Sequence, residues 1–116
     1  MSGVTIYHNP RCSTSRKALE LIRAKGIKPT IIDYLKTPPS APELDEILTK
    51  LGLQPRQLMR RKEPIYRDLD LERPGLTRKH LIQAMVDNPV LIERPIVLSM
   101  GKAALGRPPE RVEGIL

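Results

Sequence analysis

The sequence predicts an α/β fold in which a helical segment is inserted between an N-terminal βαβ unit and a C-terminal β-hairpin and helix. A short β-rich run opens the chain, helical stripes occupy its middle, and a second β-rich run followed by a turn lies near its end. The 116 residues include no Trp, no Phe and only three Tyr. We therefore expect an aliphatic core, and the length predicts one domain over residues 1–116.

The first β-rich run covers residues 4–7 and is followed by turn formers at 8–10. The next stretch is helical, because its apolar residues Ala18, Leu19 and Ile22 recur at helical spacing. Gly26 lies where this helix needs a left-handed end, and residues 30–34 read as a second strand. These pieces predict one βαβ unit, right-handed by the general rule.

The middle of the chain is predicted to be helical. Ser40 and Glu43 have capping-box spacing before an apolar stripe that ends at Gly52. A shorter helix is expected to begin near Pro55. The charged stretch 64–75 contains Pro and Gly, which predict irregular structure there.

A further helix is capped by Thr77 and stopped by Asn88-Pro89. Residues 96–98 then supply a strand, and Gly101-Lys102 is the predicted turn of a hairpin whose return strand holds residues 103–105. Pro108-Pro109 begins a final short helix. This order of elements is compatible with a thioredoxin-like sheet, although other α/β arrangements satisfy the same pattern. Pro95 directly precedes the third strand, where thioredoxin-like folds place a cis-proline beside the active-site cysteine.

Cys12 lies between the first strand and the first helix, so its sulfur is expected at a helix N-terminus. Free N–H groups and the positive end of the helix dipole favour a thiolate there. Arg11 and Arg16 add positive charge nearby, which predicts a nucleophilic thiol near neutral pH. The alternative from position alone is an inert, partly buried cysteine.

Cys12 is the only cysteine of the chain. The position that holds the second thiol of a C-x-x-C redox motif is Ser15, so the protein cannot close its own disulfide. An external thiol must clear an oxidised or loaded Cys12, which points to glutathione or a glutaredoxin as the reductant.

Other catalytic and metal-binding classes lack their motifs. The arginine of a C-x5-R phosphatase loop would stand at position 18, which is Ala18, and no G-x-x-x-x-G-K-[ST] loop is present. His8 and His80 stand far apart with one cysteine between them, so no zinc site is expected. We predict no metal and no bound cofactor.

A thiolate that attacks a tetrahedral oxyanion needs guanidinium groups, because their N–H forks match its geometry and offset its charge. Arg60, Arg94 and Arg107 could serve, or could be solvated surface arginines. Arg94 is the strongest of the three candidates, since it precedes Pro95 and a thioredoxin-like fold would carry it next to Cys12.

Three polar residues around Cys12 have two possible roles each. His8 could tune the active-site loop or cap the end of a strand. Asn9 and Ser15 could donate to a bound anion, or could fix the turn and the helix start.

Four motifs of the chain, in order, resemble the glutaredoxin-dependent arsenate reductases, and the chain looks closest to the short, chromosomally encoded branch of that family. The motifs are Tyr7-His8-Asn9-Pro10-Arg11-Cys12-Ser13, Tyr34-Leu35-Lys36-Thr37-Pro38-Pro39, Arg94-Pro95-Ile96-Val97 and Gly106-Arg107-Pro108-Pro109-Glu110.

The resemblance implies an arsenic-detoxifying enzyme in which Cys12 attacks arsenate, glutathione joins and reduces the arsenic, and glutaredoxin restores the thiol. It also implies that Arg60, Arg94 and Arg107 bind the oxyanion. Arg61 stands next to Arg60, so a shift of one residue would exchange their roles.

The net charge of +7 would attract small oxyanions, nucleic acid or acidic lipid. A nucleic-acid-binding module is disfavoured by the few aromatic residues. A thioredoxin-like regulator that docks on RNA polymerase is a rival, although Ser15 breaks the C-x-x-C switch of such proteins. A thiol reductase for another substrate is the third alternative.

The single cysteine and the absence of a signal-peptide pattern predict a reducing, cytoplasmic location. No apolar run approaches the roughly 20 residues of a membrane span. We expect a monomer.

Overall fold

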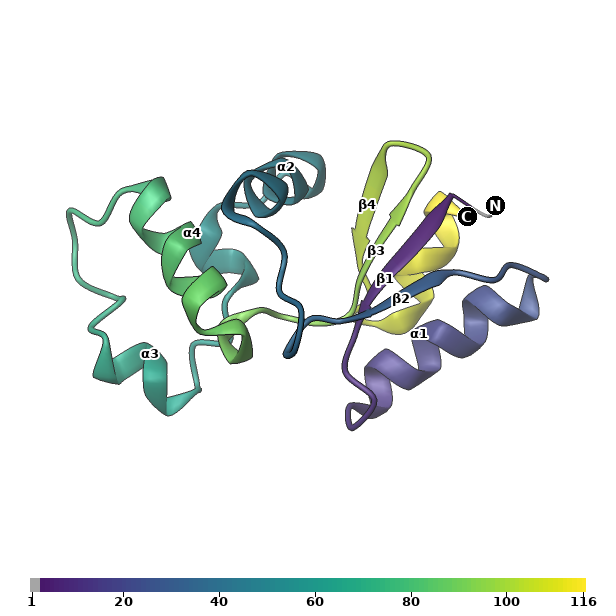
Figure 1. The fold of residues 1–116 in the computed structure, drawn as a ribbon, viewed down its shortest axis with the longest axis horizontal. Helices are drawn as coiled ribbons and strands as arrows, with labels where there is room; N and C mark the ends of the chain where they lie inside the picture. Colours follow the sequence, from purple (N-terminus) through teal and green to yellow (C-terminus); the bar gives the residue numbers. More distant parts are fainter. Residues whose placement is uncertain (1–2) are drawn as a thin grey trace. The chain divides into compact units, whose positions relative to one another are not determined.

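The computed structural model describes residues 3–116, and the chain forms two compact units. The sheet unit comprises residues 1–37 and 94–116, and the helical unit comprises residues 38–93. Figure 1 shows the elements of both units. The prediction of one domain over residues 1–116 stays a prediction.

The sheet unit contains four strands in the order β2-β1-β3-β4. They are β1 (Val4–His8), β2 (Thr30–Asp33), β3 (Ile96–Ser99) and β4 (Lys102–Leu105). β1 pairs with β2 in parallel, whereas the pairs β1–β3 and β3–β4 are antiparallel. The mixed sheet and its helices confirm the predicted α/β class.

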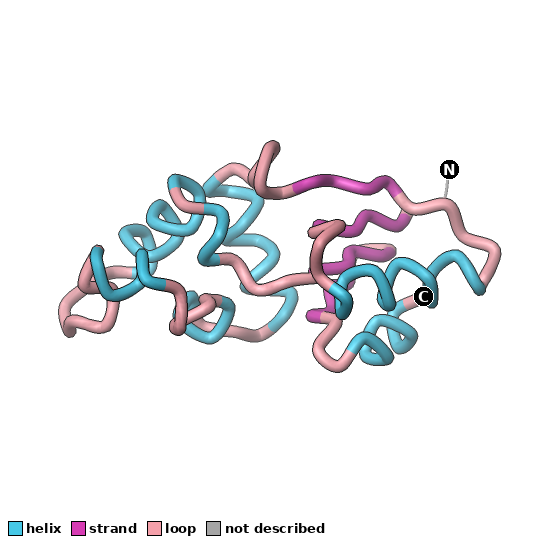
Figure 2. The backbone as a smooth tube through the Cα atoms, turned by 90° about the horizontal axis from the view of Figure 1, so that it is seen from below, coloured by secondary structure: helices cyan, strands magenta, loops and turns pink. Residues whose placement is uncertain are grey.

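Helix α1 (Ser13–Ala24) connects β1 to β2 and completes the predicted βαβ unit. The 3-10 helix η3 (Pro109–Ile115) ends the chain and packs beside α1. Figure 2 shows both helices next to the four strands. Alternate residues of the central strands and one stripe of α1 form the core. The buried members are Val4, Ile6, Ala18, Leu19, Ile22, Val97 and Val112.

The helical unit is built on α2 (Ala41–Leu51) and α4 (Arg78–Asp87), which pack together. The shorter elements are η1 (Pro55–Leu58), α3 (Pro64–Asp68) and η2 (Pro89–Leu91). Their inward-facing aliphatic residues are buried as the helical stripes predict. These residues include Leu44, Ile47, Leu48, Leu58, Leu81, Ile82, Met85 and Leu91.

The structure corrects three local predictions. The stretch 64–75 is not wholly irregular, because α3 begins in it at Pro64, a residue whose fixed φ suits the first turn of a helix. The hairpin turn is Met100-Gly101, with φ of 50° and 80°, one residue before the predicted turn. The helices at 55 and 109 are 3-10 helices, the tighter form common in short pieces.

No helix within residues 3–116 has both the length and the apolar character that a membrane span requires.

Candidate active site

Cys12 is the N-cap residue of α1 and has an extended backbone, with φ −94° and ψ 121°. Its N–H donates to the Asn9 carbonyl oxygen over 3.0 Å, and its own carbonyl accepts from the Arg16 N–H over 3.0 Å. The thiol is partly buried. The strand-turn-helix sequence therefore places the sulfur where the first N–H groups of the helix point, as predicted.

The pKa of Cys12 is lowered from its ordinary value. Burial raises this pKa, but the backbone N–H groups of Ser15 and Thr14 and the charge and hydrogen bond of the Arg94 guanidinium lower it, and the lowering effects dominate. These groups all stabilise the thiolate over the thiol. The site therefore favours the sulfur anion, which is the nucleophilic form of the thiol.

The turn before β3 brings Arg94 to Cys12. Arg94 lies two residues before β3, the antiparallel neighbour of β1, and the Arg94–Pro95 peptide bond is cis. Arg107 lies close by, because its Nη1 donates to the Arg94 carbonyl oxygen over 3.1 Å. Two of the three predicted arginines thus belong to the same unit as Cys12, on the segments that flank β3 and β4.

Ser15 fixes the loop before α1. Its Oγ accepts from the Asn9 N–H over 3.1 Å and lies 2.6 Å from His8 Nδ1, and its side chain is fully buried. The Asn9 side chain in turn accepts from the Arg11 N–H over 3.0 Å. Both side chains therefore form hydrogen bonds within the loop, in keeping with the predicted role of fixing the turn and the helix start. Donation from Asn9 or Ser15 to a bound anion stays a prediction.

His8 is the last residue of β1 and is buried. Burial lowers its pKa, Asp33 on the neighbouring strand raises it, and the charges of Arg23 and Arg16 lower it, for a net lowering. The site therefore favours the neutral imidazole over the imidazolium. Arg16 supports the same loop, because its Nη1 donates to the Pro10 carbonyl oxygen over 2.9 Å.

Arg60 belongs to the helical unit. Its Nη1 forms an ion pair of 2.6 Å with Glu63 Oε1, and its backbone N–H donates to the Leu91 carbonyl oxygen over 2.7 Å. Arg61 instead donates from Nε to the Arg56 carbonyl oxygen over 3.3 Å. The role of Arg60, or of Arg61, as the third oxyanion-binding arginine stays a prediction.

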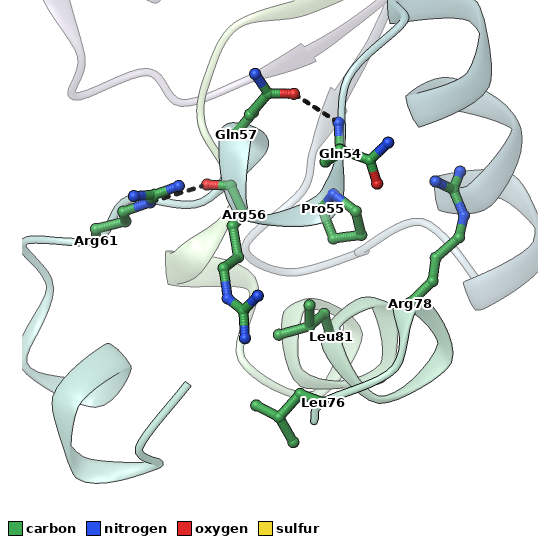
Figure 3. A pocket seen from close by; sticks show the side chains of 8 residues that line it. All are labelled: Gln54, Pro55, Arg56, Gln57, Arg61, Leu76, Arg78 and Leu81. Atoms are coloured by element: carbon green, nitrogen blue, oxygen red, sulfur yellow. Dashed lines mark hydrogen bonds between the residues drawn. The ribbon is translucent and has the colours of Figure 1, made fainter. Parts of the chain in front are cut away.

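Arg61 also lines a hollow of about 360 Å³ within the helical unit. Figure 3 shows the residues that line this hollow, with Arg56 and Arg78 on either side of Pro55 and Leu81. Arg56 donates to the Leu71 and Arg73 carbonyl oxygens, and Arg78 pairs with Asp45 at 2.6 Å. These guanidinium groups are thus bonded within the helical unit.

Gly106 is a residue that the sequence reasoning left without a role. A Cβ atom at this position would lie 2.8 Å from Pro95 Cγ and 3.1 Å from Val112 Cγ1, and the Gly106 N–H donates to the Pro95 carbonyl oxygen over 2.9 Å. Only glycine allows this close approach, so Gly106 positions the Arg94-Pro95 turn. The sequence signal for this role is the position of Gly106 directly before Arg107 in the fourth motif.

Metal ligands do not gather in the described part of the chain: residues 3–116 contain no cluster of three or more His, Cys, Asp or Glu side chains able to hold an ion.

Known proteins match this chain over nearly its whole length. Residues 7–115 match the model of the ArsC family. An Escherichia coli K12 protein, the uncharacterized YfgD, is 53% identical over 94% of this chain and 92% of its own length. An arsenate reductase of Neisseria meningitidis is 49% identical over 100% of both chains. The structure of an arsenate reductase from Vibrio cholerae superposes with a TM-score of 0.94 at 49% identity, over 97% of each chain. The chain therefore belongs to the ArsC family.

Proposed function

We propose that this protein is an arsenate reductase that uses the Cys12 thiolate as its nucleophile and takes its electrons from glutathione and glutaredoxin. Membership of the ArsC family supports the substrate, since several similar proteins bear the name arsenate reductase. The position of Arg94 beside the sulfur of Cys12 is the observation that carries the proposal. It puts a fixed positive charge next to a thiolate, where an oxyanion must come to react.

In the proposed reaction the Cys12 sulfur attacks the arsenic atom of arsenate, and a hydroxyl group leaves as water after protonation. Negative charge gathers on the remaining oxygens during attack. The guanidinium groups of Arg94 and Arg107 offset this charge with directed N–H donors. Arg60 is the proposed third donor.

Two thiols supply the two electrons that convert arsenic from the pentavalent to the trivalent state. Cys12 provides one, and glutathione provides the other because Ser15 occupies the place of a second cysteine. Arsenite leaves, and a disulfide joins Cys12 to glutathione. A glutaredoxin thiolate then attacks the glutathione sulfur, and Cys12 returns as a thiolate.

The test is arsenate-dependent oxidation of NADPH, coupled through glutathione reductase, glutathione and glutaredoxin. The native chain is compared with Cys12→Ser and Arg94→Ala. We expect no turnover above background for Cys12→Ser and a loss of about 10²- to 10³-fold for Arg94→Ala. Arg111→Ala is the matched control, because Arg111 is an exposed arginine of the same unit; it is expected to keep the native rate.

Absence of arsenate turnover in the native chain would reject the proposal. If Cys12 nevertheless reacts rapidly with alkylating agents, the site would be that of a thiol reductase for another substrate. Binding to RNA polymerase without any turnover would favour the regulatory alternative instead.

A further inference from the structure

The net charge of the chain is confined to one of its two units. The sheet unit contains 11 Lys and Arg against 4 Asp and Glu, whereas the helical unit contains 9 of each kind. The full +7 of the sequence therefore lies on the unit that carries Cys12. The composition of the sequence gives only the total charge, and its division between the units requires the structure.

The two units also differ in how their charges are paired. In the helical unit several cations have a carboxylate partner, as in the pairs Lys50–Glu46 at 3.1 Å and Arg78–Asp45 at 2.6 Å. On α1, Arg16, Lys17 and Arg23 are exposed. Within residues 3–116 no carboxylate lies at salt-bridge distance from any of these three.

These cations share one side of α1. Arg16 and Arg23 are seven residues apart, so they lie almost in line along the helix, and Lys17 is next to Arg16. The opposite stripe of the helix is buried in the core. Glu20, exposed between Arg16 and Arg23, is the one acidic residue of α1. We call the residues Arg16, Lys17 and Arg23 the α1 basic face.

Arg16 and Lys17 are unfavourable for the helix itself, whereas Arg23 lies in the last turn, where a cation is favourable. Cations near a helix N-terminus oppose its dipole, and α1 has no acidic residue in its first turn, whereas α2 has Glu43 there. The thiolate does not require the whole face either, because the guanidinium that lowers the pKa of Cys12 is that of Arg94. Arg16 also supports the loop before Cys12, whereas the exposed charges of Lys17 and Arg23 are available to a molecule outside the chain.

We propose that the α1 basic face is the docking surface for a protein thiol donor whose nucleophilic cysteine is surrounded by acidic residues. This proposal rests on the proposed function, in which an external thiol must reach Cys12. The partner's thiolate attacks the glutathione sulfur of the disulfide at Cys12 and forms a new disulfide with it. The old S–S bond breaks, its electron pair returns to Cys12 as a thiolate, and the partner carries the glutathione away.

Charge and position favour a protein over a nucleic acid. Cys12 caps the same helix, so a partner seated on the N-terminal half of α1 has the sulfur within reach. The exposed side of α1 carries no aromatic residue on which a base could stack. Opposite charge raises the rate at which two proteins meet, and salt weakens this effect.

The test measures how fast a preformed disulfide between Cys12 and glutathione is reduced, with no arsenate present, so that its outcome does not depend on arsenate turnover. The thiol probes are an acidic glutaredoxin, glutathione and neutral dithiothreitol. The test variant is Lys17→Glu with Arg23→Glu. The matched control carries both Lys62→Glu and Lys79→Glu, at two exposed lysines of the helical unit. It changes the net charge by the same amount as the test variant does.

We expect the test variant to lower the rate with glutaredoxin by about tenfold at low ionic strength. The control is expected to stay within about twofold, and the difference should vanish near 0.5 M salt. The milder double variant, Lys17→Gln with Arg23→Gln, should lose an intermediate part of the glutaredoxin rate. Dithiothreitol should reduce the disulfide of every variant at the same rate, and this equality would show that the site is intact.

Three results would overturn the proposal. Equal losses in the test and control variants would show that only the net charge matters. An equal loss with glutathione would assign the face to a small anionic thiol. Tight, salt-dependent binding of duplex DNA that the test variant abolishes, with glutaredoxin rates unchanged, would assign it to nucleic acid.

Discussion

Cys12 and Arg94 act on each other through charge, and this coupling gives a direct prediction. Because the backbone N–H of Ser15 and the Arg94 guanidinium lower the pKa of the thiol, the rate of alkylation by iodoacetamide should rise with pH around a midpoint below that of an ordinary cysteine. Arg94→Ala should move this midpoint upward and slow alkylation at pH 7 severalfold, while Arg94→Lys should restore part of the effect. A native midpoint at or above about 8.5 would contradict this description of the site.

His8 gives a prediction about stability. Its folded-state pKa lies below the ordinary value of 6.5, mainly because it is buried. Between these two pKa values the unfolded chain binds a proton that the folded chain does not, so this contribution to stability is present above pH 6.5 and is lost as the pH falls. The free energy of unfolding of the native chain should therefore exceed that of His8→Gln by more at pH 7.5 than at pH 5.5 in urea titrations. A difference that grows toward acid pH would mean that the fold stabilises the imidazolium.

At the scale of single residues, the sequence predicts which residue reacts but not which hydrogen bonds its neighbours form. The place of Cys12 follows from a strand, a turn and a helix in succession, all within a few residues. The bond between His8 and Ser15, by contrast, depends on the path of the loop between them. Both roles considered for His8 were consistent with its position at the end of a strand.

Among the elements, the segment from Gly106 to η3 supports the active-site turn by close packing. Gly106→Ala would drive a methyl group against Pro95 and Val112, which we expect to lower the free energy of unfolding by about 1–3 kcal/mol. It should also lower arsenate turnover, because Arg94 precedes the displaced proline.

Gly114→Ala is the control for this change. No atom lies within 4 Å of the Cβ that it would add, so its stability should stay within about 0.5 kcal/mol of native. Both are measured by urea unfolding and by the coupled assay. Equal stability of the two variants would show that the Gly106 contact relaxes without cost.

Elements governed by local chemistry are well predicted. α2 begins after Ser40, whose Oγ accepts from the Glu43 N–H over 3.3 Å, and ends at Gly52 with φ 68°. Both signals lie within the segment they control. The stretch 64–75 is different, because it is tied to a residue outside it: the Arg56 guanidinium donates to the Leu71 and Arg73 carbonyl oxygens. Its composition alone indicates only turns.

At the scale of the whole molecule, the order of strands is the feature that sequence reasoning left open. β1 lies at the centre, and its antiparallel partner β3 follows more than eighty residues later, after the helical unit. No local pattern encodes such a pairing. The same pairing brings Arg94 to Cys12, and the division of the chain into units reveals that its net charge is one-sided.

The most direct test of the central claim is the amount of arsenite formed per NADPH oxidised in the complete coupled system. Two electrons from each NADPH convert one arsenate to one arsenite, so we predict a ratio of one for the native chain and no arsenite above background for Cys12→Ser. Oxidation of NADPH without arsenite, or arsenite formation that persists in Cys12→Ser, would contradict arsenate reduction at this thiol.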